Sequence, residues 1–352
     1  MPIKVLIVDD SALVRQLLAE LLGQDRDIRV VGTAPDPFIA REKIKALNPD
    51  VITLDIEMPR MDGLTFLEKV MTLHPMPVLV VSTLTQRGAD VALQALEMGA
   101  VDYVAKPLLD LREGLAALGD ELIAKVKAAA GARIRPRLGV PMAPQKLIFD
   151  RRLSTQGWIV AVGASTGGVE ALQTLLTALP GDAPAVLVTQ HMPEGFTASF
   201  AQRLNTHCAM DVTEARDGAR VMQGHAFIAS GNHHLELARS GAHYICRVSV
   251  GAPVSGHRPS VDVLFRSVAR VAGKNATGVI LTGMGGDGAE GLLEMRRAGA
   301  HTLGQDKASC LIYGMPKVAK EIGAVEMELP LSRIPREILA QGERAAQNQG
   351  HA

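Results

Sequence analysis

The sequence predicts an α/β fold in two domains, each built on a mostly parallel sheet. Short apolar runs alternate along the chain with stretches whose apolar residues recur at i, i+3, i+4 and i+7, the spacing of an amphipathic helix. The runs lack polar alternation, which is expected of strands that helices cover on both faces. The chain has 352 residues, more than one ordinary domain needs.

The first segment predicts a doubly wound parallel sheet over residues 1–124. After the first apolar run, Val14, Leu17, Leu18 and Leu21 follow the helical spacing, so strand and helix alternate. The expected strands are Val5 to Val8, Val51 to Leu54, Val78 to Val81, and Val101 to Val104.

Residues 125–150 are predicted to be a linker. They hold six basic residues and one acidic residue, whereas residues 1–124 hold 12 basic and 19 acidic. Glycines and prolines interrupt any long helical pattern there. They are Gly131, Pro136, Gly139, Pro141 and Pro144.

Residues 151–345 are predicted to form a second α/β domain. Long apolar runs resume, and the expected strands are Trp158 to Val162, Ala185 to Thr189, and Thr277 to Leu281. The polar stretch from Gln341 to Ala352 is expected to be a loose tail.

The charge and cysteine content exclude several function classes. Lysine plus arginine and aspartate plus glutamate each total 37, so no overall charge points to nucleic acid or an anionic membrane. The run Val5 to Val8 is too short for a signal peptide or a membrane span, which predicts a cytoplasmic protein without direct membrane insertion. The three cysteines are widely spaced and are expected to be buried thiols.

Polar side chains follow the predicted strands of the first domain where each strand ends. They are Asp9, Asp10, Asp55, Ser82 and Lys106. Because parallel strands share one carboxyl edge, three carboxylates, a hydroxyl and an ammonium group should converge. Clustered carboxylates repel unless a cation intervenes, and Mg²⁺ takes such oxygens together with phosphoryl oxygens. Taken singly, Asp9 and Asp10 could cap the following helix and Asp55 could be a solvated loop acid.

This combination resembles the receiver domain of two-component response regulators, which has a flavodoxin-like fold, over about residues 3–124. The resemblance implies that Asp55 accepts a phosphoryl group from a histidine kinase. It implies a Mg²⁺ site and a pair of residues that engage the phosphoryl group. The implied Mg²⁺ ligands are Asp9, Asp10, Asp55 and the backbone carbonyl of Glu57, and the implied pair is Ser82 and Lys106.

A glycine-rich turn, GASTGG at residues 163–168, closes the first strand of the second domain and carries Ser165. The glycines allow a tight turn, and the start of the next helix offers unpaired N–H groups. Such a turn can cradle a phosphate, present a nucleophilic serine beside oxyanion donors, or simply reverse the chain.

His191 and Asp287 are predicted to join Ser165 at the same sheet edge. His191 follows the strand Ala185 to Thr189 within the motif QHMP, and Asp287 lies in TGMGGDG after the third strand. Singly, the histidine could be an ordinary loop residue and the aspartate a helix cap. Together, a hydroxyl, an imidazole and a carboxylate at neighbouring strand ends predict a catalytic triad. The adjacent His233 and His234 are not expected to bind metal, because neighbouring strand residues face opposite sides.

The receiver, the basic linker and the three motifs GASTGG, QHMP and TGMGGDG resemble the CheB family of chemotaxis protein-glutamate methylesterases over nearly the whole chain. The resemblance implies a Rossmann-like hydrolytic domain that needs no cofactor at the esterase site. It implies Ser165 as nucleophile, His191 as general base and then acid, and Asp287 as its orienting partner. It also implies that the Met284 N–H helps to hold the oxyanion and that Thr166 shapes the site.

The implied substrates are γ-glutamyl methyl esters on methyl-accepting chemotaxis receptors, with methanol released and some receptor glutamines deamidated. Phosphorylation of Asp55 is expected to control this activity. The alternative is a response regulator whose second domain is a noncatalytic binding module, with GASTGG gripping a phosphate-bearing ligand.

Overall fold

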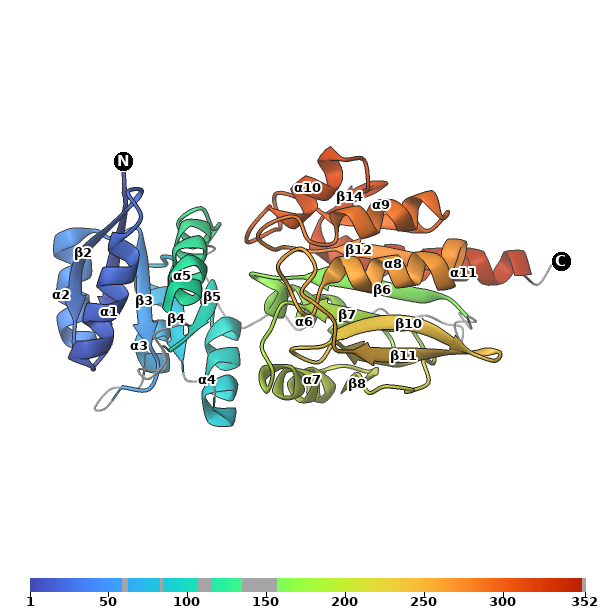
Figure 1. The fold of residues 1–352 in the computed structure, drawn as a ribbon, viewed down its shortest axis with the longest axis horizontal. Helices are drawn as coiled ribbons and strands as arrows, with labels where there is room; N and C mark the ends of the chain where they lie inside the picture. The colour runs from blue at the N-terminus through green and yellow to red at the C-terminus, as the bar shows by residue number, and fades with distance from the viewer. Residues whose placement is uncertain (59–62, 83–84, 107–114, 135–156, 350–352) are drawn as a thin grey trace. The chain divides into compact units, whose positions relative to one another are not determined.

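The structure is a computed structural model that describes residues 1–58, 63–82, 85–106, 115–134 and 157–349 (Figure 1). The chain divides into two compact units, residues 1–141 and 142–352. Both contain parallel sheets with helices, so the predicted α/β fold is confirmed. Most of the predicted linker, including Pro136 and the residues after it, lies outside the described residues.

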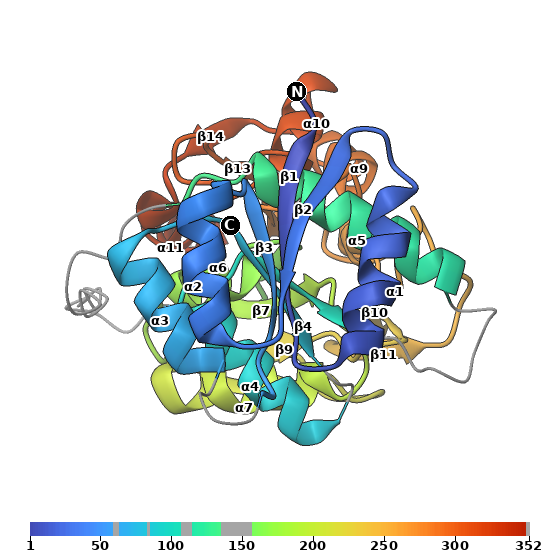
Figure 2. The same cartoon turned by 90° about the vertical axis from the view of Figure 1, so that its left-hand side faces the viewer.

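The first unit is a five-stranded parallel sheet in the order β2-β1-β3-β4-β5. Helices α1 and α5 lie on one face, and α2, α3 and α4 lie on the other (Figure 2). The strands are β1 (Ile3–Val8), β2 (Ile28–Ala34), β3 (Val51–Asp55), β4 (Val78–Ser82) and β5 (Asp102–Ala105). The helices are α1 (Ala12–Gly23), α2 (Pro37–Leu47), α3 (Gly63–Leu73), α4 (Gln86–Glu97) and α5 (Leu115–Ala130).

Side-chain caps begin three of these helices. Ser11 accepts a hydrogen bond from the Val14 N–H at the start of α1. Asp36 accepts two N–H groups at 2.9 Å at the start of α2, and Thr85 accepts one at 3.0 Å at the start of α4. These oxygens satisfy N–H groups that the helix itself leaves without acceptors, so the local sequence defines where each helix begins.

Helix α5 extends six residues past the domain boundary expected at residue 124. Val126 and Ala129 are fully buried, and the Lys125 ammonium lies 2.8 Å from Glu121 and 3.6 Å from Asp102. The basic residues at the start of the predicted linker therefore belong to the first unit.

The second unit is a seven-stranded parallel sheet in the order β14-β13-β12-β6-β7-β9-β8. A separate antiparallel hairpin, β10-β11, packs against helix α8. The strands are β6 (Ile159–Ala164), β7 (Ala185–Gln190), β8 (Asp211–Glu214), β9 (His225–Ile228), β10 (His234–Ser240), β11 (His243–Ser249), β12 (Ala276–Ile280), β13 (His301–Gln305) and β14 (Met327–Leu329).

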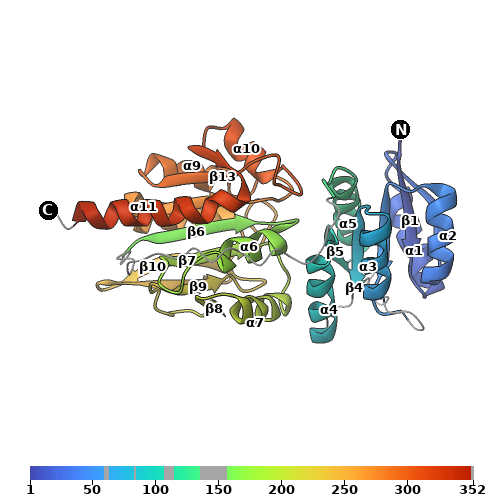
Figure 3. The ribbon, with the colours of Figure 1, turned by 180° about the vertical axis from the view of Figure 1, so that it is seen from behind.

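Helices cover both faces of this sheet. Helices α8, α9 and α10 lie on one face, and α6, α7 and α11 lie on the other (Figures 1 and 3). They are α6 (Gly168–Thr177), α7 (Phe196–His207), α8 (Val261–Val271), α9 (Ala289–Arg297), α10 (Met315–Glu321) and α11 (Ile334–Gln349), with short 3-10 helices at Gly273–Asn275 and Leu331–Arg333. Among the described residues, no helix combines the length and the apolar character that crossing a membrane requires.

The expectation of a loose tail after Gln341 is wrong for the described residues, because α11 continues to Gln349. Gln341 is buried, and its amide donates to the Glu337 carboxylate one turn earlier at 2.7 Å. The polar composition hid a helix whose first half packs on the unit through Ile334, Ile338 and Leu339, all fully buried.

The sheet order determines where functional side chains can meet. Strand β6 is central and pairs with β7 on one side and β12 on the other, so the chain runs outward in opposite directions from it. Ligands of open α/β sheets bind at the carboxyl ends of strands where such a reversal occurs. In the first unit, the same reversal falls between β1 and β3.

Replacing Thr277 should destabilise the second unit. The Thr277 hydroxyl accepts a hydrogen bond from the buried indole of Trp158 at 3.1 Å. We expect Thr277→Val to lower the free energy of unfolding by about 1 to 3 kcal/mol, because the indole N–H loses its acceptor. Trp158 is the chain's single tryptophan, so its fluorescence during urea denaturation reports this unit.

Thr189→Val is the matched control. Its hydroxyl is equally buried in the same sheet and has no hydrogen-bond partner among the described residues. That variant should be as stable as the original chain or more stable. Equal destabilisation by both variants would contradict the assignment.

Candidate functional site

Three strand ends bring Ser165, His191 and Asp287 together. Ser165 directly follows β6, His191 directly follows β7, and Asp287 lies in the loop between β12 and α9. Because β6 pairs with both other strands, the three side chains emerge at one edge of the sheet.

The turn that carries Ser165 is held by backbone contacts. Ser165 donates its N–H to the Thr282 carbonyl at 3.1 Å, and its own carbonyl accepts the Gly168 N–H at 2.7 Å. Gly167 sits before the first residue of α6 with φ of 78°, a conformation that other residues rarely adopt. These contacts fix the backbone of the turn between β6 and α6.

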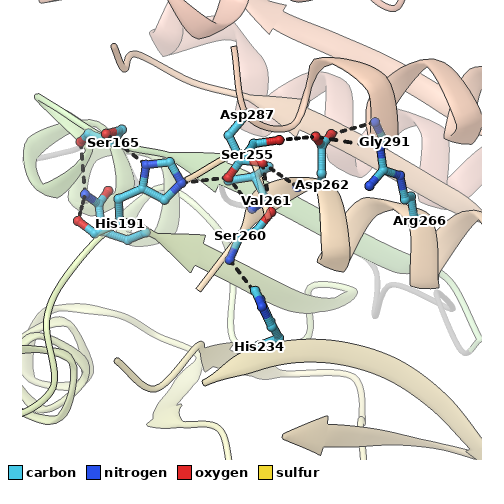
Figure 4. Close-up of polar contacts among 11 residues, drawn as sticks. Ser165, His191, His234, Ser255, Ser260, Val261, Asp262, Arg266, Asp287 and Gly291 are labelled. Carbon is cyan, nitrogen blue, oxygen red and sulfur yellow. Dashed lines mark hydrogen bonds and ion pairs between the residues drawn. The ribbon is translucent and has the colours of Figure 1, made fainter. Parts of the chain in front are cut away.

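The three side chains form a hydrogen-bonded line (Figure 4). His191 Nδ1 lies 3.2 Å from Ser165 Oγ, and His191 Nε2 lies 2.8 Å from Asp287 Oδ2. A carboxylate can only accept, so Nε2 carries the proton and Nδ1 is the acceptor facing the serine hydroxyl. The two ring nitrogens have the reverse of the roles they take in chymotrypsin-like proteases.

The Asp287 carboxylate is buried and fully hydrogen-bonded. Besides His191, it accepts the Val261 N–H at 2.7 Å, the Asp262 N–H at 3.1 Å and the Ser260 hydroxyl at 2.8 Å. Burial alone would raise the pKa of Asp287, but the His191 hydrogen bond and charge and the two backbone N–H groups outweigh it and lower that pKa. The carboxyl therefore stays ionised at neutral pH.

The first turns of α8 and α9 are joined by reciprocal hydrogen bonds to two aspartates. Asp287, just before α9, accepts N–H groups at the start of α8, and Asp262 in α8 accepts the Gly291 N–H in α9 at 2.7 Å. The other Asp262 oxygen accepts the Ser255 hydroxyl at 3.1 Å, while burial and the nearby Asp287 charge raise the pKa of Asp262. The exchange ties the position of Asp287 to the packing of both helices (Figure 4).

Two histidines that the sequence analysis did not select support this site. The His257 ring stacks on the His191 ring, with centroids 3.7 Å apart and planes inclined by 14°. His234 accepts the Ser260 N–H through Nδ1 at 3.2 Å and binds the Ala252 carbonyl through Nε2 at 3.0 Å. No apolar run precedes His257, so the strand-end argument could not find it.

Residues Thr166 and Met284 lie on the two loops beside the serine. Thr166 is buried, and its carbonyl accepts the Thr282 hydroxyl at 3.0 Å. Met284 follows Gly283, which packs so closely on Ser165 that a Cβ on the glycine would lie 2.8 Å from the serine Cβ. In the described part of the chain, the Met284 N–H donates to no backbone carbonyl.

The first unit holds an acidic cluster at its own sheet edge. Lys106, after β5, places its ammonium 2.6 Å from Asp55 Oδ2 and 3.6 Å from Asp9 Oδ2. Asp9 and Asp55 are buried, whereas Asp10 is exposed. One carboxylate oxygen from each of the three aspartates lies within 4.8 Å of the others.

This cluster fits a divalent cation. Asp9 Oδ2 is buried without a hydrogen-bond partner among the described residues, which leaves an oxygen for a ligand to satisfy. Burial, followed by the nearby Asp55 charge, raises the pKa of Asp9 to about 6, and burial also raises that of Asp55. A cation would offset both costs, and clustered carboxylate oxygens are typical ligands of hard divalent cations.

The remaining predicted residues of the first unit lie near this cluster in the chain. The Glu57 N–H donates to Asp55 Oδ1 at 2.9 Å, which orients the carboxylate. Ser82 is buried at the end of β4 and donates its hydroxyl to the Gly88 carbonyl at 3.1 Å. The roles of the Glu57 carbonyl and of Ser82 toward ligands stay predictions.

Comparison with known proteins gives two matched regions. Residues 160–338 match the family described as CheB methylesterase, and residues 5–118 match the response regulator receiver domain. The catalytic domain of Thermotoga maritima CheB methylesterase superposes with a TM-score of 0.51 at 36% identity, covering 52% of this chain and 98% of that one.

Two relatives align with this chain over nearly their whole lengths. A Geobacter metallireducens protein-glutamate methylesterase/protein-glutamine glutaminase is 54% identical, and the alignment covers 98% of each chain. A Burkholderia lata protein of the same name is 56% identical over 96% of this chain and 95% of that one.

The fold and the two sites therefore define a hydrolase joined to a response-regulator receiver domain. Within that class, the chain belongs to the CheB methylesterase family, as the motifs suggested.

Asp9→Asn should separate cation binding from folding. We expect the affinity for Mg²⁺ to fall at least about tenfold, because a carboxylate ligand is lost. In EDTA at neutral pH, the variant should be at least as stable as the original chain, because the raised pKa means that ionised Asp9 disfavours the folded state.

The sign of the pH effect follows from the same shift. The folded chain binds the Asp9 proton more tightly than the unfolded chain does, so metal-free stability from this group increases as pH falls through about 6. The Asp9→Asn variant should not show this rise in stability at lower pH. Calorimetric Mg²⁺ titration and thermal unfolding in EDTA measure both effects, and unchanged Mg²⁺ affinity would contradict the ligand assignment.

Proposed function

We propose that this chain removes methyl groups from glutamate γ-methyl esters of methyl-accepting chemotaxis receptors, releasing methanol, and also deamidates receptor glutamines. The hydrogen-bonded line Ser165–His191–Asp287 is the observation that carries the proposal. The names of the full-length relatives support the choice of substrate. A serine hydroxyl, an imidazole and a carboxylate in hydrogen-bonded order support hydrolysis by acyl transfer to a serine.

Ser165 is the proposed nucleophile and His191 its base. The serine oxygen bonds to the ester carbonyl carbon while its proton passes to His191 Nδ1, which lies 3.2 Å away. The tetrahedral intermediate then expels the methoxy group, which takes that proton and leaves as methanol. Water adds to the acyl-enzyme by the same proton route, and the Ser165 oxygen departs with the proton, leaving a glutamate.

Asp287 is the proposed orienting partner of His191. Its carboxylate accepts a hydrogen bond from the Nε2 N–H at 2.8 Å, keeps the unprotonated Nδ1 facing the serine, and stabilises the imidazolium formed in each step. Amide hydrolysis passes through the same kind of tetrahedral intermediate with ammonia as the leaving group, so the one site serves both substrates.

The oxyanion of the intermediate is assigned to the loops beside Ser165. The Met284 N–H is the proposed donor, and its lack of a carbonyl acceptor among the described residues supports this. Thr166 shapes the site through the hydrogen bond of its carbonyl to Thr282, which joins the two loops.

The first unit is the proposed control element, with a chemotaxis histidine kinase as phosphodonor. Asp55 is the proposed phosphoryl acceptor, and Ser82 and Lys106 are the residues proposed to engage the phosphoryl group. When bound by Asp9, Asp10, Asp55 and the Glu57 carbonyl, Mg²⁺ offsets the negative charge that gathers there. The close Lys106–Asp55 contact supports this arrangement, because the ammonium already lies beside the accepting carboxylate.

Ser165→Ala should abolish methanol release from membranes that carry methylated receptors. Asp287→Asn should lower turnover by about 10³- to 10⁴-fold, because the amide cannot hold His191 in the required tautomer. Ser240→Ala, at an exposed hairpin position, is the matched control and should release methanol normally. Near-normal turnover by either site variant would rule out the triad.

Asp55→Asn should remove the response to a phosphodonor. With Mg²⁺ and acetyl phosphate, we expect methanol release by the original chain to rise by about 5- to 150-fold, the range of ordinary coupling free energies. The Asn variant should stay at its basal rate. Glu20→Gln, which neutralises an exposed carboxylate of the same unit, should respond fully. A full response by Asp55→Asn would refute the phosphoryl-acceptor assignment.

A further inference from the structure

Gln190 links the backbones of the two residues that the proposed reaction depends on most. It is the last residue of β7 and is only 4% exposed. Its side-chain Nε2 donates to the Ser165 carbonyl at 3.0 Å and to the His191 carbonyl at 3.2 Å. A single amide nitrogen thus spans the turn that carries the nucleophile and the strand end that carries the base.

The orientation of this amide follows from its partners. Both are carbonyl oxygens, so the nitrogen must face them and Oε1 must point the other way. Oε1 is buried and accepts no hydrogen bond among the described residues. A buried acceptor without a partner destabilises a fold, so stability alone does not account for a glutamine here.

Gly168 leaves the space that Oε1 occupies. A Cβ on Gly168 would lie 2.0 Å from Gln190 Oε1 and 2.8 Å from the Ala164 Cβ. A side chain at Gly168 would therefore displace the Gln190 amide from its present position.

The amide adds a link that the backbone does not provide. The backbone already joins His191 N–H to the Ala164 carbonyl at 3.2 Å, one residue before the serine. Only the Gln190 amide, within the described contacts, bonds both Ser165 and His191 at their own carbonyls. The 3.2 Å separation of Ser165 Oγ and His191 Nδ1 depends on how these two backbones sit relative to each other.

We propose that Gln190 is a positioning residue for the esterase reaction, which holds the Ser165 turn and the His191 strand end at the separation that proton transfer needs. This inference rests on the proposed function. Gln190 acts through Ser165 and His191, so its loss should slow the chemical step and leave substrate binding nearly unchanged.

Gln190→Met tests this directly, because methionine has a similar size and cannot donate. We expect kcat for methanol release to fall by about 10- to 100-fold, the scale of a small misplacement of reacting groups, with KM nearly unchanged. Labelling of Ser165 by a fluorophosphonate should slow in parallel. Gln341→Met, a buried glutamine in α11 of the same unit, is the matched control and should keep the original kcat.

Gln190→Glu gives a readout that a purely structural role would not move. The ionised carboxylate would face two carbonyl oxygens and repel them, whereas the protonated acid could donate to one. The rate of this variant relative to the original chain, corrected for the folded fraction, should therefore rise as pH is lowered. A ratio independent of pH would overturn the proposal.

Gly168→Ala provides a second route that keeps the glutamine and displaces its amide. We expect kcat to fall here as well, without a change in KM. If Gln190→Met folds poorly, Gly168→Ala and Gln190→Glu test whether Gln190 positions the two residues. Folded variants that keep the kcat of the original chain would overturn the inference. Absence of methanol release by the unaltered chain would instead refute the proposed function.

Discussion

The site in the second unit depends on four hydrogen bonds to the buried carboxylate of Asp287. Two come from the backbone at the start of α8, one from the Ser260 hydroxyl and one from His191. An ionised carboxylate without such partners would be strongly disfavoured in the interior. The start of α8 therefore stabilises the charge that orients His191, and the helix is as much a part of the site as the side chains are.

The same principle places both sites of the chain. In each unit, polar residues follow buried parallel strands at the point where the strand order reverses, so groups distant in sequence meet at one edge. The first unit gathers Asp9, Asp55 and Lys106 there, and the second gathers a hydroxyl, an imidazole and a carboxylate. The two edges differ in charge, which suits one to a cation and a phosphoryl group and the other to acyl transfer.

Strand-end residues were predictable from the sequence, and supporting residues were not. Ser165, His191 and Asp287 follow strong apolar runs, so the parallel sheet alone brings them to one edge. His257 lies in a loop without periodicity, and the role of Gln190 depends on where its amide points, which residue order does not reveal. The sequence analysis did not give β2, β8, β9, β10, β11, β13 and β14. Of these, β2 and β8 are edge strands that are partly exposed and lack continuous apolar runs. The end of α11 escaped because polar residues dominate it.

The spacing of the three site residues along the chain has a consequence during synthesis. His191 is 26 residues from Ser165, and Asp287 is 96 residues from His191. Asp287 follows β12, so its carboxylate reaches His191 through the pairing of β12 with β6. Contacts this distant in sequence form late relative to local ones. A ribosome-bound chain in which α9 has not yet emerged has no assembled triad, so hydrolysis begins only after β12 has paired with β6 and Asp287 has reached His191.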